Sequence, residues 1–222
     1  MKTIRFTLPQ GNNVEFAPEK AVGAGFTGRN QTAVRAHIAE LERQGIPPPK
    51  DFPILFPLIP QLLWQGPTVP VIGPHNTPEV EPVLLFLEEK VFLTVGSDQT
   101  DRALEATHLT LSKNTSPKPL ANAAWPIPDV LPHWDRLTLE ARTPDSVIQR
   151  GLLSELLPYP ELERLARRVI SEQSTGVCFC GTIPTQLPWP PSPFTLTLRL
   201  FDPILNRSIS HSFILQILPE RY

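Results

Sequence analysis

Apolar residues recur at helical spacing in two segments of the chain, which predicts amphipathic helices over 33–44 and 160–172. In the first segment Asn30 or Thr32 can cap the start, and Gly45 followed by prolines from Pro47 onward can end the helix. The predicted apolar faces consist of Val34, Ile38 and Leu41 in the first helix and of Leu162, Leu165, Ala166 and Val169 in the second.

Elsewhere, short apolar or alternating runs predict β-strands. These runs lie at 4–8, 83–87, 91–95, 136–140, 177–180, 195–201 and 210–218. Many strands with two helices indicate an α+β, mainly β fold. Because no segment has the composition of a linker, we expect residues 1–222 to form a single domain.

Composition and charge argue against some classes of function. The 28 prolines are spread along 222 residues, which favours short strands joined by ordered loops. A net charge of −2 without a basic block argues against nucleic acid as a partner, and no apolar run approaches the roughly 20 residues that span a membrane. Cys178 and Cys180 suit reduced core thiols, and the amino terminus lacks the apolar segment of a secretion signal, so we expect a cytoplasmic protein.

The stretch PEVEPVLLFLEEKVFLTVGSDQTDR, residues 78–102, carries carboxylates on both sides of an apolar run. Glu79 and Glu81 are two apart, so on a strand their side chains share a face. If the chain reverses near residues 88–90, both lie close to Asp98. Three gathered carboxylates repel one another unless a cation lies between them, and oxygen ligands suit Mg²⁺, Mn²⁺ or Ca²⁺. The spacing equally allows a solvated hairpin end.

Eight short motifs occur in a fixed order along the chain. They are GRN at 28–30, HxxE at 37–40, PxLF at 53–56, ExE at 79–81, DxTxR at 98–102, a lysine at 113, QxG at 149–151 and GTxP at 181–184. Together they resemble the fumarylacetoacetate hydrolase superfamily. The SDxTDR and SKxxxPKP segments resemble a short bacterial branch of it, a domain of unknown function. The resemblance implies a distorted β-roll or barrel with a few helices, and a homodimer.

The resemblance also implies a metal site and a set of neighbouring roles. Glu79, Glu81 and Asp98 would bind Mg²⁺ or Mn²⁺, with Ca²⁺ possible in a crystal, and the metal would stabilise an enolate. His37 would act as general base, oriented by Glu40. The other implied residues are Lys113 at the oxyanion with Lys118 as a competitor, Arg102 at a substrate carboxylate, and Arg29, Thr182 and Gln149 in the cleft.

Two departures from the superfamily pattern concern the substrate. The bacterial branch usually has histidine where this chain has Gln99, which removes a proton role there. Glu105 stands where small members often have glutamine, and it would repel a second substrate carboxylate.

We therefore predict a divalent-metal-dependent hydrolase, decarboxylase or isomerase acting on a small 2-oxo or 1,3-dicarbonyl acid. The alternatives are a non-catalytic metal- or ligand-binding module that retains the fold, and a structural β protein. The expected partners are the small-molecule oxo acid and a second copy of the chain. The apolar stretch at 52–63 suits either the interface of a homodimer or the core.

Overall fold

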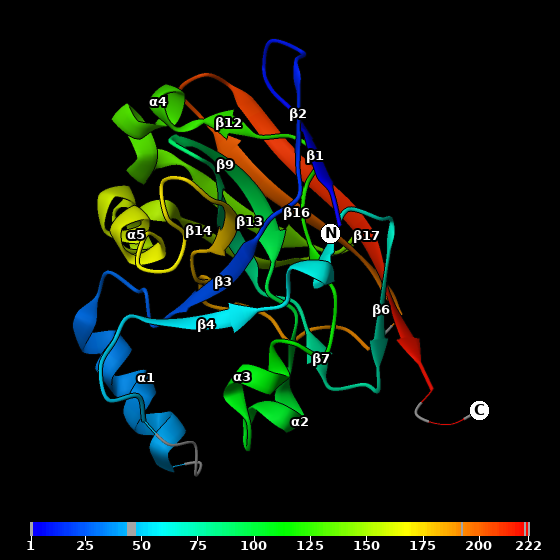
Figure 1. The fold of residues 1–222 in the computed structure, drawn as a ribbon. Coiled ribbons are helices and arrows are strands. Elements are labelled where there is room, and N and C mark those ends of the chain that lie inside the picture. Colours follow the sequence, from blue (N-terminus) through cyan, green and yellow to red (C-terminus); the bar gives the residue numbers. More distant parts are fainter. Residues whose placement is uncertain (1, 44–47, 192, 220, 222) are drawn as a thin grey trace.

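Two β-sheets pack against each other in the computed structural model, which describes residues 2–43, 48–191, 193–219 and 221 (Figure 1). The larger sheet consists of β12 (Trp125–Pro126), β9 (Lys90–Ser97), β8 (Val80–Leu87), β15 (Thr175–Phe179), β3 (Lys20–Gly25) and β4 (Ile54–Leu58), in that order. The smaller sheet consists of β14 (Val147–Leu152), β13 (Thr138–Arg142), β16 (Phe194–Asp202), β17 (Arg207–Leu218) and β6 (Thr68–Ile72).

Short elements connect and cover these sheets. The minor strands are β1 (Ile4–Thr7), β2 (Asn13–Phe16), β5 (Leu63–Trp64), β7 (Asn76–Thr77), β10 (Thr100–Asp101) and β11 (Lys118–Pro119). The helices are α1 (Gln31–Arg43), α2 (Arg102–Glu105), α3 (Leu109–Ser112), α4 (Ile127–Val130) and α5 (Tyr159–Ala166), with 3-10 turns η1 (Pro60–Leu62), η2 (Leu131–Arg136) and η3 (Leu153–Glu155). The predicted α+β, mainly β class is confirmed, and neither sheet closes into a barrel within the described residues.

The larger sheet is buried on both faces, which explains the nearly continuous apolar runs of β8 and β9. Leu84 and Phe86 of β8 belong to the core shared with the smaller sheet. Val83 and Leu85 belong to a second cluster with residues of the β1–β2 hairpin. Because side chains alternate along a strand, Glu81 projects from the same face as Val83.

The β8–β9 hairpin is confirmed, with Leu87 paired to Lys90 at its turn. The strands predicted at 4–8, 177–180, 195–201 and 210–218 are also present as β1, β15, β16 and β17. The strand expected from residue 136 begins two residues later, because 131–136 forms the turn η2 with a proline at its start. Strands β3, β4, β6 and β14 were not predicted, and all four contain glycine or proline, which weaken a strand pattern.

The first predicted helix is confirmed as α1, and the Asn30 side chain accepts a hydrogen bond from the Ala33 N–H at 3.1 Å, as a cap does. Its predicted end at Gly45 and Pro47 lies outside the described residues. The second prediction was too long, since α5 ends at Ala166.

The end of α5 follows from the packing of the residues that come after it. Ile170 turns inward and is fully buried over Gly176, while Val169, expected on the apolar face, is 43% exposed. Arg167 donates to the carbonyl oxygens of Ser171 and Glu88, which holds this non-helical turn in place.

The apolar stretch at 52–63 contributes mainly to the core. Phe56, Leu58 and Leu63 are buried, whereas Ile59 is exposed. Cys178 and Cys180 are buried and free, as predicted. Within the described residues, no helix has the length and apolar character needed to cross a membrane.

Candidate metal centre

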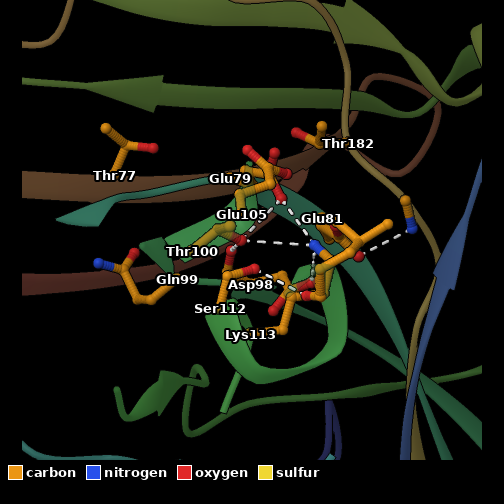
Figure 2. Close-up of polar contacts among 12 residues, drawn as sticks. Thr77, Glu79, Glu81, Asp98, Gln99, Thr100, Glu105, Ser112, Lys113 and Thr182 are labelled. Atoms are coloured by element: carbon orange, nitrogen blue, oxygen red, sulfur yellow. Dashed lines mark hydrogen bonds and ion pairs between the residues drawn. The ribbon is translucent and has the colours of Figure 1, made fainter. Parts of the chain in front are cut away.

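Glu79, Glu81 and Asp98 meet at the open end of the β8–β9 hairpin, as the sequence predicts. The strand register pairs Val80 with Ser97, and the Asp98 N–H donates to the Glu79 carbonyl at 3.0 Å. One carboxylate oxygen from each of the three residues lies within 4.8 Å of the others. Figure 2 shows Glu79 and Asp98 joined to the Lys113 ammonium, with Glu81 beside them. We refer to Glu79, Glu81 and Asp98 as the carboxylate triad.

Two buried lysines bind Asp98, one at each carboxylate oxygen. Lys113 Nζ donates to Asp98 Oδ2 at 2.7 Å and to Glu79 Oε2 at 3.3 Å. Lys118 Nζ donates to Asp98 Oδ1 at 2.6 Å and to the carbonyl of Gln99. The sequence offered Lys118 only as a competitor for the position of Lys113, but the structure places both at the triad.

Glu81 is held by a backbone N–H group. Its Oε2 accepts a hydrogen bond from the Gly181 N–H at 2.8 Å. Gly181 has a φ of +99°, and a Cβ atom at this position would overlap the Thr27 hydroxyl, so only glycine fits. The glycine of the GTxP motif thus brings a backbone donor to the triad, a role that sequence reasoning did not assign.

Burial and charge separate the three carboxylates. Burial raises the pKa of Glu81 well above its ordinary value, and repulsion from Asp98 and Glu79 raises it further. Burial alone would also raise the pKa of Asp98, but Lys113 and Lys118 bring it below the usual range. Burial alone would likewise raise the pKa of Glu79, but Lys113 and Arg102 bring it below its ordinary value. Among the described residues of the triad, Glu81 is therefore the carboxylate whose negative charge is least compensated.

The donor set fits a hard divalent cation. Three carboxylates supply only oxygen ligands, which Mg²⁺, Mn²⁺ and Ca²⁺ prefer over softer donors. Glu81 and Asp98 are buried, while the Glu79 side chain is 14% exposed and leaves one side of the triad open. These residues could hold such an ion, and a bound cation would offset the repulsion that Asp98 and Glu79 exert on the Glu81 carboxylate.

Arg102 lies at this open side, where it links the triad to Glu105. Its Nη2 donates to Glu79 Oε1 at 2.8 Å and its Nη1 donates to Glu105 Oε2 at 2.8 Å. Its Nε donates to the Thr77 hydroxyl at 2.6 Å. The resemblance assigns Arg102 to a substrate carboxylate. In the structure its guanidinium is already paired with Glu79, a candidate metal ligand, and with Glu105.

Gln99 faces away from the triad (Figure 2). Its side chain is fully buried, accepts a hydrogen bond from Ser97 Oγ at 2.7 Å and donates to Asn76 Oδ1 at 3.1 Å. Its amide thus serves the contacts with Ser97 and Asn76, in keeping with the expectation that glutamine at this position has no proton role. Of the two departures from the superfamily pattern, Glu105 is therefore the one that concerns the choice of substrate.

Gln149 and Thr182 fix the backbone that carries the two glutamates. Gln149 Oε1 accepts from the Val80 N–H at 3.1 Å, and its Nε2 donates to Thr182 Oγ1 at 3.0 Å and to the Ile183 carbonyl at 2.7 Å. Thr182 Oγ1 donates to the Val80 carbonyl at 2.9 Å. Both residues thus clamp the peptide between Glu79 and Glu81, and their contact with a substrate stays a prediction.

The remaining predicted residues lie elsewhere. His37 and Glu40 occupy the exposed surface of α1, with His37 Nδ1 3.9 Å from Glu40 Oε2. Arg29 forms an ion pair with Asp135 at 2.6 Å and donates to the Leu156 carbonyl. Their described contacts do not include the triad, so the catalytic and substrate-binding roles of these residues stay predictions.

A family model described as a protein of unknown function, DUF2848, matches residues 24–213. The chain belongs to the DUF2848 family. No protein of curated function matches it.

Solved structures similar to this DUF2848 chain have the fumarylacetoacetate hydrolase fold. A protein from Yersinia pestis CO92 assigned to that family superimposes with a TM-score of 0.67 at 15% identity, over 96% of this chain and 100% of that chain. A family member from yeast gives 0.64 at 16%, over 93% and 96%. A 5-carboxymethyl-2-hydroxymuconate delta-isomerase from Mycobacterium smegmatis gives 0.61 at 16%, over 95% and 84%. The predicted fold is confirmed.

Proposed function

We propose that this DUF2848 protein is a divalent-metal-dependent hydrolase, decarboxylase or isomerase acting on a small 2-oxo or 1,3-dicarbonyl acid. The observation that carries the proposal is the carboxylate triad, whose ligand oxygens lie within 4.8 Å of one another with Lys113 beside them. The fold adds support, because the similar solved structures include a hydrolase-family protein and an isomerase.

The residues of the triad would hold Mg²⁺ or Mn²⁺, which supplies Lewis-acid stabilisation of an enolate oxygen when bound. Burial alone would lower the pKa of the Lys113 ammonium, but Asp98 and Glu79 raise it well above its ordinary value. Lys113 is therefore charged at neutral pH. A charged donor fixed beside the reacting oxygen stabilises the negative charge that develops there. Lys118 holds Asp98 in place from the other side.

A proton acceptor completes the proposed mechanism. His37 would take a proton from water or from the carbon next to the substrate carbonyl, with Glu40 orienting its ring. Because both side chains are exposed on α1, this role requires α1 to approach the triad when the substrate binds.

The test is turnover of acylpyruvates and oxaloacetate with Mg²⁺ or Mn²⁺, compared with the same protein in EDTA. We expect metal-dependent turnover that falls by about 100-fold or more in His37→Ala, the range for loss of a general base. Glu42→Ala, an exposed change on the same helix, is the matched control and should keep full activity. Turnover that persists in His37→Ala removes this histidine from the mechanism.

One observation favours a second candidate, a metal- or ligand-binding module without turnover. Arg102, the cation at the open side, is already bound to Glu79 and Glu105. A protein of this kind would bind Mg²⁺ and yet turn over none of the tested oxo acids.

A further inference from the structure

Glu105 adds a fourth carboxylate to the open side of the triad. Its side chain is 20% exposed, comparable to the 14% of Glu79, so both border the solvent. Glu105 also lines a surface cavity of about 320 Å³ with residues 106–111, so there is space beside it. Arg102 joins Glu105 to Glu79, so a ligand that reaches the triad on the side of Glu79 comes near the charge of Glu105.

The charges of this region do not favour a ligand with two carboxylates. Four carboxylates, those of Glu105 and the triad, stand against three cations, those of Arg102, Lys113 and Lys118. A bound divalent cation would leave a net charge of +1. A ligand with one carboxylate balances this charge, whereas a second carboxylate exceeds it.

The donors of Arg102 lead to the same conclusion. A guanidinium binds a carboxylate best when both terminal nitrogens donate to it together. In this protein Nη1 donates to Glu105 and Nη2 donates to Glu79, each at 2.8 Å. Because both terminal nitrogens are occupied, a second carboxylate on a ligand would have to displace both Glu105 and Glu79 to obtain the bidentate contact.

We propose that the Arg102–Glu105 pair makes the site select oxo acids with one carboxylate and an uncharged far end over dicarboxylates. The inference rests on the proposed metal-dependent function and specifies its substrate class. Glu105 acts as the specificity-determining residue: it repels a distal carboxylate and keeps Arg102 from binding one.

The experiment uses two stable oxo-acid mimics, oxalylglycine and its amide. Both present the same chelating oxamate head, but only the acid has a distal carboxylate. Binding is measured by calorimetry with saturating Mg²⁺. We expect the wild type to bind the amide about tenfold more tightly, as one extra like charge near a protein surface predicts. Glu105→Gln should abolish most of this preference by improving the binding of the acid.

Two further variants sharpen the result. Glu89→Gln removes an exposed glutamate at the turn of the β8–β9 hairpin, away from the triad, and should keep the wild-type preference for the amide. Arg102→Gln leaves Glu105 without its partner and should widen the preference for the amide. This opposite shift also tests the inference if Glu105→Gln does not fold.

The outcomes separate this inference from the proposed function. An amide preference that is unchanged in both Glu105→Gln and Arg102→Gln, or a wild type that prefers the acid, overturns the inference and leaves the metal site standing. A wild type that is not stabilised by Mg²⁺ and binds neither mimic overturns the proposed function, and the inference with it.

Discussion

The two ends of the β8–β9 hairpin both carry acidic residues, yet these residues differ in burial and in hydrogen-bond partners. At the turn, Glu88 and Glu89 are exposed, and Glu88 has a φ of +57° that serves the reversal. At the open end, Glu81 and Asp98 are buried and Glu79 is partly buried. Acidic pairs that look alike in the sequence thus occupy opposite environments.

The difference teaches what burial of a carboxylate requires. A buried carboxylate must be paired or hydrogen-bonded, because its desolvation otherwise costs several kcal/mol. The open end obtains its partners from distant segments, with Lys113 and Lys118 on one side and the Gly181 N–H on the other. The turn end needs none of these. The reading of the open end as a solvated hairpin end is therefore wrong.

The largest expected effect comes from removing Lys118. Lys118→Met leaves a fully buried Asp98 oxygen without its cation, which should lower the free energy of unfolding by about 3–5 kcal/mol. Lys90→Met, an exposed lysine at the turn end, is the matched control and should change it by less than about 0.5 kcal/mol. Urea denaturation in EDTA measures both, and equal losses would contradict the contrast between the two ends.

A smaller effect is expected from Gln149, which clamps the strand start. Gln149→Leu leaves the buried Val80 N–H without its acceptor and removes the closer of two donors to the Ile183 carbonyl, which should cost about 2 kcal/mol. The same substitution at the exposed Gln173, next to the turn end, should cost less than about 0.5 kcal/mol. A loss below about 0.5 kcal/mol at Gln149 would show that the clamp does not hold the open end together.

Much of the open end was predictable from local spacing. The apolar runs on either side of residues 88–90 indicate a hairpin, and the two-residue spacing of Glu79 and Glu81 places them on one face. Asp98 then follows from the length of the second strand. These inferences involve one continuous stretch, so strand geometry alone decides them.

The rest depends on tertiary contacts that spacing does not encode. Lys118 reaches Asp98 because β11 pairs with β5, a two-residue strand that was not expected. The side-chain direction of Gln99 depends on its buried partner Asn76, and the contact of Arg102 with Glu79 joins residues 23 apart in the sequence. Motif order located these residues near the triad, but only the structure shows which atoms they contact.

The central claim, that the open end is a divalent-metal site, is tested most directly by thermal unfolding with added Mg²⁺. At ten times its dissociation constant, a bound ion adds about 1.4 kcal/mol, which raises the melting temperature of a domain of this size by about 3–6 °C. We expect this rise in the wild type and in Glu88→Ala plus Glu89→Ala, and no rise in Glu79→Ala plus Glu81→Ala. An equal rise in all three proteins, or none in the wild type, would contradict the claim.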